Sequence, residues 1–167
     1  MTTSPRPPLP LALIVDDDAT FRMLSRMSLE QDELLVEEAV SGEAAIEFVS
    51  STVPDIIILD WVMEGMSGID LMRMIRTNPQ SPNPFVPVIM LSGHTSIEHV
   101  QKARDAGVNE FIAKPVSVKT MMTRMAAVIE HPRPYVRTSV YFGPCRRRRQ
   151  DEHRGPERRA AAKQAAE

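Results

Sequence analysis

Short runs of consecutive Val, Ile and Leu residues recur along the chain, and polar residues do not alternate with apolar ones inside them. Runs of this kind are typical of strands that are buried on both faces, which implies a parallel sheet covered by helices. We therefore expect five strands, at about Leu11–Val15, Leu34–Ala39, Asp55–Leu59, Val86–Leu91 and Glu110–Ala113.

The segments between these runs carry apolar residues at helical spacing. They predict five helices, at about Ala19–Gln31, Ser41–Ser51, Ile69–Arg76, Ser96–Ala106 and Val118–Glu130. Ser41 is expected to cap the second helix, and Gly107 is a good residue to end the fourth. In the first helix, Met23, Leu24 and Met27 share one face. Strands that alternate with helices in this way indicate an α/β fold with helices on both faces of a parallel sheet.

Polar residues follow four of the apolar runs. Asp16 and Asp17 follow the first run, Asp60 the third, Ser92 the fourth and Lys114 the fifth. The carboxyl ends of parallel strands form the ligand-binding edge of such a sheet, so these side chains are expected to converge. Three carboxylates, one hydroxyl and one ammonium group in a single crevice suit a divalent cation and a phosphoryl group.

Composition bounds the domain organisation and the compartment. A chain of 167 residues has room for one ordinary domain and a tail, and no apolar run approaches the roughly 18 residues of a membrane span. The proline-rich start lacks the features of a signal peptide, and a single cysteine, Cys145, excludes an internal disulfide framework. We expect a cytoplasmic protein that does not associate with a membrane.

The net charge of −2 conceals two oppositely charged parts. Residues 1–130 hold 10 Lys/Arg and 18 Asp/Glu, whereas residues 131–167 hold 10 and 4. This asymmetry suggests that the acidic body and the basic tail do different jobs.

Four motifs carry a family resemblance, at Leu13–Asp18, Ile58–Gly68, Met90–His94 and Phe111–Pro115. In their order and spacing, and in their places at strand ends, they resemble the receiver domain of two-component response regulators. The resemblance covers about residues 9–130. It implies a flavodoxin-like, doubly wound (βα)5 fold with the strand order 2-1-3-4-5.

The resemblance also implies the chemistry of the site. Asp60 would be the phosphoacceptor, and Asp16, Asp17 and Asp60 would hold Mg²⁺ together with the backbone carbonyl of Val62. Independently of any family, an aspartate attacks a negatively charged phosphoryl donor poorly unless a cation offsets the charge. Clustered carboxylates also repel one another without a cation.

Further roles follow from the same resemblance. Lys114 would contact a phosphoryl oxygen and would precede a cis proline, Pro115. Ser92 would be the switch hydroxyl and Phe111 the switch aromatic. Two positions flank the expected phosphoryl group and depart from the usual pattern: Val62 is apolar and His94 is bulky. We hypothesise that these two residues set the lifetime of the phosphorylated state.

Each residue also has a simpler interpretation. Asp16 alone could cap a helix, Lys114 could be an exposed strand-end lysine, and Ser92 could be a turn residue. Methionines of the predicted helices are best explained as core filler, at Met72, Met74, Met121, Met122 and Met125. The joint occurrence of four motifs at four strand ends argues against the simpler interpretations for the site.

Two alternative functions fit part of the sequence. Residues 16–20 fit the D-x-D-x-T opening of haloacid-dehalogenase-type phosphatases, but no acidic pair follows Lys114 to complete that family's metal site, and Asp60 would have no role. A phosphorylation-independent scaffold or adaptor that works through its basic tail is the other alternative. Receiver-like scaffolds usually lack one of the site residues, and this chain has them all.

The expected organisation is a proline-rich leader at 1–8, a receiver domain at 9–130 and an Arg-rich extension at 131–167. The extension is either largely disordered or docked on the receiver or a partner through Tyr135, Val140, Tyr141 and Phe142. It is too short for a typical DNA-binding domain, and Arg146–Arg149 is weak evidence for nucleic-acid binding, which we consider unlikely.

The family resemblance also implies the partners of a stand-alone receiver. A histidine kinase or histidine phosphotransfer protein would dock near Phe21, Arg22 and Pro115. A downstream protein target would contact the face formed by the fourth helix, fifth strand and fifth helix, including His99, Lys102 and Glu110.

Overall fold

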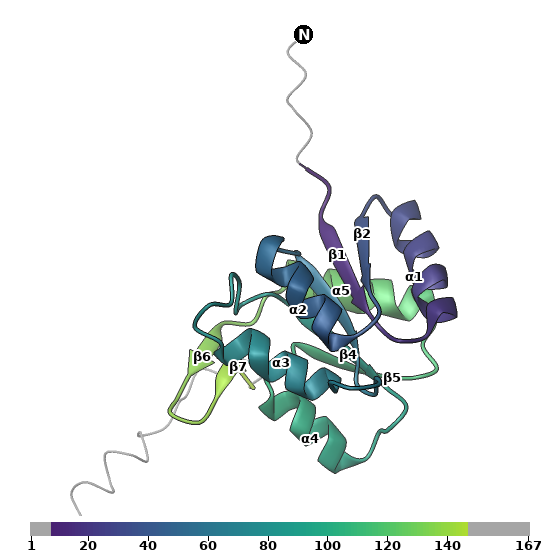
Figure 1. Cartoon of the computed structure of the whole chain (residues 1–167). Helices are drawn as coiled ribbons and strands as arrows, with labels where there is room; N and C mark the ends of the chain where they lie inside the picture. Colours follow the sequence, from purple (N-terminus) through teal and green to yellow (C-terminus); the bar gives the residue numbers. More distant parts are fainter. Residues whose placement is uncertain (1–7, 147–167) are drawn as a thin grey trace, which may run out of the picture.

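The computed structural model describes residues 8–146, and its centre is a five-stranded parallel sheet in the order β2-β1-β3-β4-β5 (Figure 1). The strands are β1 (Leu11–Val15), β2 (Leu35–Ala39), β3 (Ile56–Asp60), β4 (Val88–Ser92) and β5 (Glu110–Ala113). The helices that connect and follow them are α1 (Ala19–Gln31), α2 (Gly42–Ser51), α3 (Gly68–Thr77), α4 (Ile97–Asp105) and α5 (Val118–Glu130). This architecture confirms the predicted flavodoxin-like fold and strand order.

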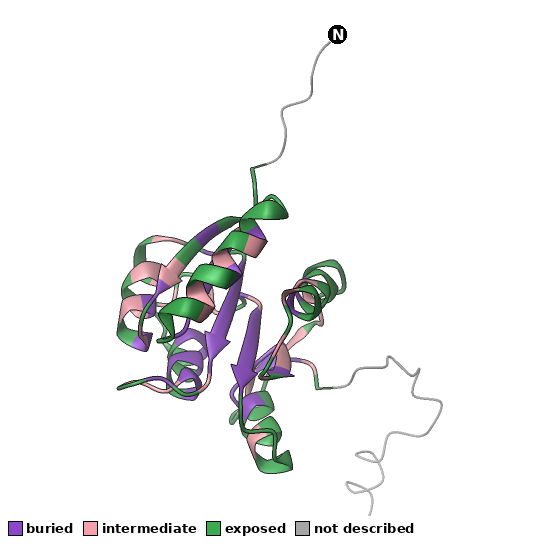
Figure 2. Cartoon of the chain, turned by 90° about the vertical axis from the view of Figure 1, so that its right-hand side faces the viewer, coloured by how far each residue is buried: buried purple, intermediate pink, exposed green. Residues whose placement is uncertain are grey.

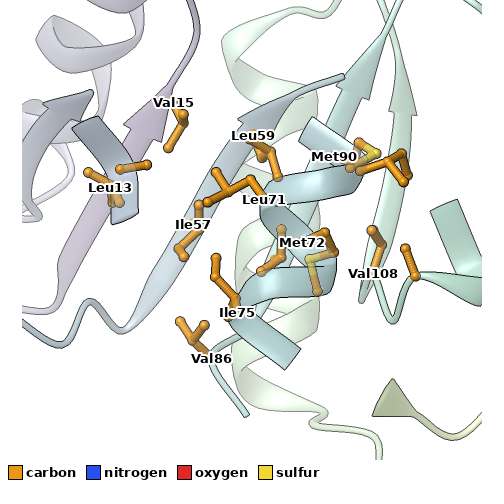
Figure 3. Packing of buried hydrophobic residues seen from close by; sticks show 14 of the residues in the cluster. Leu13, Val15, Ile57, Leu59, Leu71, Met72, Ile75, Val86, Met90 and Val108 are labelled. Atoms are coloured by element: carbon orange, nitrogen blue, oxygen red, sulfur yellow. The ribbon is translucent and has the colours of Figure 1, made fainter. Parts of the chain in front are cut away.

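Two hydrophobic clusters cover the two faces of the sheet, because successive side chains of a strand point to opposite sides. One cluster packs against α2, α3 and α4 and includes Leu13, Leu59, Leu71, Met72 and Met90 (Figure 3). The other packs against α1 and α5 and includes Ile14, Leu29, Ile58, Leu91 and Met121. Figure 2 shows the buried strands between helices whose outer faces are exposed. Within residues 8–146, no helix combines the length and apolar character needed to cross a bilayer.

Helix ends follow the local sequence signals. Ser41 caps α2 as predicted, and its side chain accepts a hydrogen bond from the Ala44 amide at 3.2 Å. Gly107 follows α4 with a φ of 91°, a left-handed conformation that favours glycine. The cap of α1 is Asp18, which accepts hydrogen bonds from two backbone amides of the first turn. The simpler interpretation of Asp16 as the cap is therefore wrong.

The apolar face of α1 noted in the sequence points to solvent. More than half of each side chain is exposed at Met23, Leu24 and Met27. Ser25 and Leu29 face the core instead. Arg22 and Arg26 both pair with Glu38 of β2, and these contacts fix the rotation of the helix against the sheet.

Three of the five methionines expected to fill the core are buried, namely Met72, Met121 and Met125. Met122 is partly buried against the same core, whereas Met74 is 39% exposed and lies outside it. The predicted start of the fourth strand was also two residues early. Pro87 has no amide proton, and the ladder of β4 begins after it, although the Pro87 carbonyl still accepts a hydrogen bond from Ile57.

The chain continues beyond α5 into a hairpin that packs on the sheet domain. Strands β6 (Tyr135–Arg137) and β7 (Phe142–Pro144) pair antiparallel beside α3 (Figure 1). The rings of Tyr135 and Phe142 meet Phe85, with all three centroid separations between 5.2 and 5.8 Å. Tyr135 and Phe142 therefore dock on the receiver, as one of the two alternatives for the extension predicts. Val140 was also expected to dock, and this is wrong, because it lies in the turn of the hairpin and is 92% exposed. Residues 147–167 lie outside the described part of the chain.

A buried arginine joins this hairpin to the rest of the fold. Arg76, at the end of α3, is 3% exposed and donates hydrogen bonds to the carbonyls of Pro84, Val86 and Gly107. It also donates to the Asn109 side chain at 3.2 Å and to the Tyr135 hydroxyl at 3.1 Å. Burial lowers the pKa of its guanidinium to about 10, so the group stays charged at neutral pH. Figure 1 shows the elements that it connects.

Candidate functional site

Strand register brings the predicted polar residues to one edge of the sheet. Asp16 directly follows β1, and Asp60 is the last residue of β3, where it pairs with Leu91 of β4. Ser92 follows Leu91 and ends β4, and the Lys114 amide donates a hydrogen bond to the Ser92 carbonyl at 2.8 Å. The four strand endings therefore converge, because parallel strands in register end side by side.

Three carboxylates form the centre of this edge. Oxygen atoms of Asp16, Asp17 and Asp60 lie within 4.8 Å of one another. Asp16 and Asp60 are buried, whereas Asp17 is exposed at the surface of the site. Hard oxygen ligands of this kind are those that Mg²⁺ prefers, and the exposed side leaves room for the water ligands that Mg²⁺ retains. The donor set therefore fits the divalent cation expected from the sequence.

Lys114 bridges two of the carboxylates. Its Nζ atom lies 2.8 Å from Asp16 Oδ2 and 2.8 Å from Asp60 Oδ1. Burial lowers the pKa of this amine, but the hydrogen bonds and charges of the two carboxylates more than offset it, and the pKa is raised overall. Lys114 therefore carries its charge over the whole physiological pH range. The interpretation of Lys114 as an ordinary exposed lysine does not describe these contacts.

For Asp60, burial has the larger influence on the pKa. Burial raises the pKa of its carboxyl group, Lys114 lowers it, and the charges of Asp16 and Asp17 raise it further, so that the net shift is upward. The ionised form of Asp60 is therefore less stable in the folded protein than in water. A carboxylate held in this state gains from any cation or reaction that offsets its negative charge.

Backbone contacts fix the positions of the flanking carboxylates. Asp16 Oδ1 accepts a hydrogen bond from the Asp18 amide at 2.9 Å, which ties the site to the start of α1. Asp17 Oδ2 accepts from the Glu64 amide at 3.1 Å, which ties the end of β1 to the loop after β3. The site is thus built from segments that are far apart in the sequence.

Gly68 sets the path of that loop. Its amide donates to the Trp61 carbonyl at 2.9 Å, and a Cβ atom at this position would lie 2.1 Å from the Asp60 carbonyl oxygen. Only a glycine allows the start of α3 to approach the end of β3 so closely. The sequence shows a glycine here but gives no sign that the backbone of Asp60 is what it approaches.

The remaining predicted residues end or follow β3, β4 and β5 at the same edge of the sheet. Ser92 is buried, and its Oγ accepts a hydrogen bond from the His94 amide at 3.0 Å. Val62, two residues after Asp60, is 55% exposed. His94 is also exposed, and its ring stacks on His99 with 5.3 Å between centroids. The Lys114–Pro115 peptide bond is cis.

Aromatic contacts surround the switch position proposed from the sequence. Phe111 meets the ring of Trp61 edge to face, with the centroids 6.3 Å apart. Trp61 directly follows Asp60 and also contacts His99. Phe21, expected from the sequence only as a docking residue for the kinase, also contacts the site, because the Lys114 amine lies 4.8 Å from the centre of its ring.

Comparison with known proteins places this geometry in a family. Residues 12–126 match the model of the response regulator receiver domain. The chain belongs to the response regulator receiver family. Receivers are signalling phosphoacceptors, and the carboxylate cluster at the sheet edge is consistent with that role.

Curated relatives of this receiver are longer proteins. It is 29% identical over 132 residues to the phosphate regulon transcriptional regulatory protein PhoB of Rhizobium meliloti (strain 1021), covering 79% of this chain and 57% of the relative. It is 30% identical over 122 residues to the response regulator MprA of Mycolicibacterium vanbaalenii, covering 73% of this chain and 51% of the relative. The chain thus spans about half the length of these relatives.

Solved structures agree with the receiver fold. The Vibrio cholerae chemotaxis protein CheY4 is 28% identical with a TM-score of 0.67, and the match covers 72% of this chain and 98% of that chain. A putative response regulator from Chloroflexus aurantiacus is also 28% identical, with a TM-score of 0.67 and a coverage of 74% and 99%. The receiver match ends at residue 126, so the β6–β7 hairpin lies beyond it.

The charge balance of the site predicts a stabilising substitution. Without a divalent cation, Asp60→Asn should raise the free energy of unfolding at neutral pH by about 1 kcal/mol, because it removes a buried charge next to two other carboxylates. The pKa of Asp60 is raised in the folded state, so the gain should shrink as the pH falls through that pKa. Urea unfolding with a chelator at neutral and acidic pH measures both effects. Asp17→Asn, at an exposed position, should gain less; an equal gain would contradict burial as the cause.

Proposed function

We propose that this chain is a receiver that accepts a phosphoryl group on Asp60 from a phosphohistidine of a histidine kinase or phosphotransfer protein. It then signals through a protein partner. The observation that carries the proposal is the Lys114 amine held 2.8 Å from both Asp16 and Asp60, inside a cluster of three carboxylates. A purely structural ion pair would need only one carboxylate beside the lysine. Phosphoryl transfer uses the amine and all three carboxylates.

Asp60 is the nucleophile of the proposed reaction. One of its carboxylate oxygens attacks the phosphorus of the phosphohistidine, the P–N bond breaks, and its electron pair returns to the imidazole, which takes up a proton from water. The product is an acyl phosphate on Asp60. Lys114 remains beside the new group and offsets its charge, and the Ser92 hydroxyl is the donor available on the neighbouring strand. Attack of water on the phosphorus reverses the modification.

Mg²⁺ is the cofactor that the carboxylate cluster suits. Asp16, Asp17 and Asp60 would hold it with the Val62 carbonyl, and it would supply charge neutralisation between nucleophile and phosphoryl oxygens. Asp17 is also hydrogen-bonded to the Glu64 amide, so the segment containing Val62 is already tied to the carboxylates.

The proposed output passes through Ser92 and Phe111. When Ser92 turns toward the phosphoryl group, the space it leaves admits the Phe111 ring, which now contacts Trp61. The surface formed by α4, β5 and α5 would change, and His99, Lys102 and Glu110 on that surface would meet a downstream protein. The kinase or phosphotransfer protein would dock near Phe21, Arg22 and Pro115. We place this exchange in the cytoplasm, in the domain of residues 9–130.

Intact-mass spectrometry tests the proposal directly. The folded chain, incubated with acetyl phosphate and Mg²⁺, should gain one phosphoryl group, and a chelator should prevent the gain. Asp60→Asn should gain none. Asp55→Asn is the matched control, because Asp55 lies at the other end of β3 and accepts a hydrogen bond from the Leu11 amide at 2.7 Å. A folded protein that stays unmodified with Mg²⁺ present would favour the phosphorylation-independent adaptor instead.

Val62 and His94, which are expected to flank the phosphoryl group, should control how long that group stays on Asp60. Val62→Asn introduces a polar group that can orient water, and His94→Ala removes the bulky ring two residues after Ser92; each should change the decay rate several-fold. Val53→Asn is the control, because Val53 is similarly exposed, at 52%, and lies at the amino-terminal end of β3. Decay of the phosphorylated mass, followed after removal of the donor, gives the rates. Identical decay in all three variants would refute the idea.

A further inference from the structure

The extension and α4 enclose a hollow on the receiver surface. It measures about 340 Å³ and lies over the amino-terminal half of β5. Its lining includes the apolar side chains of Val100, Ala103, Val108 and Phe111. A hollow of this size accommodates one or two side chains of a peptide rather than a whole folded domain.

Arginines surround this apolar floor. Arg104 comes from α4, whereas Arg133 and Arg146 come from the extension. Within residues 8–146, Glu110 is the one acidic residue of the lining, and its carboxylate already lies 3.7 Å from Arg124 of α5. Asp105 contacts two of these arginines, Arg104 at 3.8 Å and Arg146 at 2.9 Å. Three arginines therefore face two carboxylates, and the described surroundings of the hollow carry a small positive excess, although residues 1–130 as a whole are acidic.

The extension holds its two arginines in place. Arg133 donates hydrogen bonds to the carbonyls of Asn109 and Cys145, which joins the end of α5 to β5 and to the end of the hairpin. Arg146 lies on the Tyr141 ring, 4.2 Å from its centre, and pairs with Asp105 at 2.9 Å. Arg133 hydrogen-bonds only to backbone carbonyls, so its charge has no carboxylate partner among the described residues. Such preorganised guanidinium groups bind carboxylates at low entropic cost.

The hollow is also connected to the phosphoacceptor. Phe111 lines it and contacts Trp61, the residue next to Asp60. A change at Asp60 that moves the Phe111 ring would alter the floor of the hollow directly. The occupant of this surface is thus placed to respond to phosphorylation.

We propose that Arg133 and Arg146 of the extension complete a groove with α4 and β5 that binds an acidic, aliphatic peptide segment of a partner protein. The inference rests on the proposed function, and it adds the chemistry of the partner and a role for the extension. Apolar side chains of the peptide fill the floor, and its carboxylates meet the arginines. The chain's own residues 147–167 are a poor occupant because they carry seven Lys/Arg and four Asp/Glu. Nucleic acid is a poor occupant because the apolar floor is mostly aliphatic and offers Phe111 as its one aromatic side chain among the described residues, whereas single strands bind by stacking on several.

An array of short synthetic peptides tests the groove on the full chain. Half of the peptides combine acidic and aliphatic residues in varied order, and the other half are the same sequences with Lys at each acidic position. We expect binding to members of the acidic half only, weaker at high salt. The double variant R133Q/R146Q should weaken the best of these by about tenfold in fluorescence anisotropy. R137Q, on the same extension but outside the groove, should stay within about twofold.

Several outcomes would overturn the inference. These are no preference for the acidic half, equal losses in R137Q and the double variant, or tighter binding of a short DNA oligonucleotide that the double variant abolishes. Thermal unfolding of each variant shows whether the hairpin remains packed, and amide shifts of Val100 and Val108 on adding peptide report occupancy of the groove itself. Intact mass with acetyl phosphate on the same samples separates the two proposals. Phosphorylation without peptide selectivity rejects the groove alone, and selectivity without phosphorylation rejects the phosphoacceptor alone.

Discussion

Arg76→Ala should lower the free energy of unfolding by about 3 kcal/mol or more, the largest effect expected of any substitution far from the phosphoacceptor. The guanidinium is buried and satisfies the carbonyls of Pro84, Val86 and Gly107. Alanine would remove this donor from all three carbonyls, leaving Val86 only the Tyr135 hydroxyl at 3.4 Å, and would open a cavity under the hairpin. Urea unfolding followed by the fluorescence of Trp61, the single tryptophan of the chain, measures the loss.

Arg73→Ala is the matched control for this experiment. Arg73 lies one turn earlier on α3, is 64% exposed at its side chain, and reaches Asp70 only at 3.6 Å. Exposed pairs of this kind contribute little, so the change should stay below about 0.5 kcal/mol. A loss for Arg76→Ala as small as that of the control would contradict the role of Arg76 as the link between receiver and hairpin.

Near the site, Gly68→Ala should be the substitution by alanine that lowers stability most. The added Cβ would lie 2.1 Å from the Asp60 carbonyl oxygen. Neither atom can turn away by a side-chain rotation, because the Cβ is fixed to the backbone and the oxygen belongs to it, so the start of α3 must move. We expect a loss of about 2–3 kcal/mol in stability and a slower phosphorylation of Asp60, because the carboxylate moves with its own backbone. Urea unfolding and the rate of mass gain measure the two effects.

Gly93→Ala is the control, because it adds the same methyl group near the site without a close contact. Gly93 directly follows Ser92, but a Cβ there would have no atom within 4 Å. The substitution should leave stability within about 0.5 kcal/mol of the original chain. Equal losses at both glycines would show that the close approach of Gly68 to Asp60 is not the cause.

The strands and the convergence of site residues could be predicted because both follow from local rules. A run of buried residues such as Ile56–Leu59 admits one interpretation, and a polar residue after each run lies at the edge where parallel strands end. That rule places Lys114 near Asp16 and Asp60, but its two contacts at 2.8 Å were not predicted, because the sequence assigned Lys114 to a phosphoryl oxygen.

The rotation of α1, the burial of Arg76 and the position of the hairpin were not predicted, because each depends on tertiary contacts. Rotation of α1 depends on Arg22 and Arg26 meeting Glu38, a pairing that helical spacing does not encode, so its apolar face could not be oriented. Arg76 resembles any arginine at a helix end until the hairpin covers it. The position of the hairpin depends on contacts of Tyr135 with Arg76 and Phe85, which are distant in the sequence and could not be predicted from it.

Mapping the phosphoryl group to one residue tests the central claim most directly. An acyl phosphate on aspartate is reduced by borohydride to homoserine, and tandem mass spectrometry of the resulting peptides locates it. We predict homoserine at Asp60 alone after treatment with acetyl phosphate and Mg²⁺, and none in the chelated sample. Homoserine at Asp16 or Asp17, or a stable phosphoryl group on any other residue, would contradict the assignment of Asp60 as the phosphoacceptor.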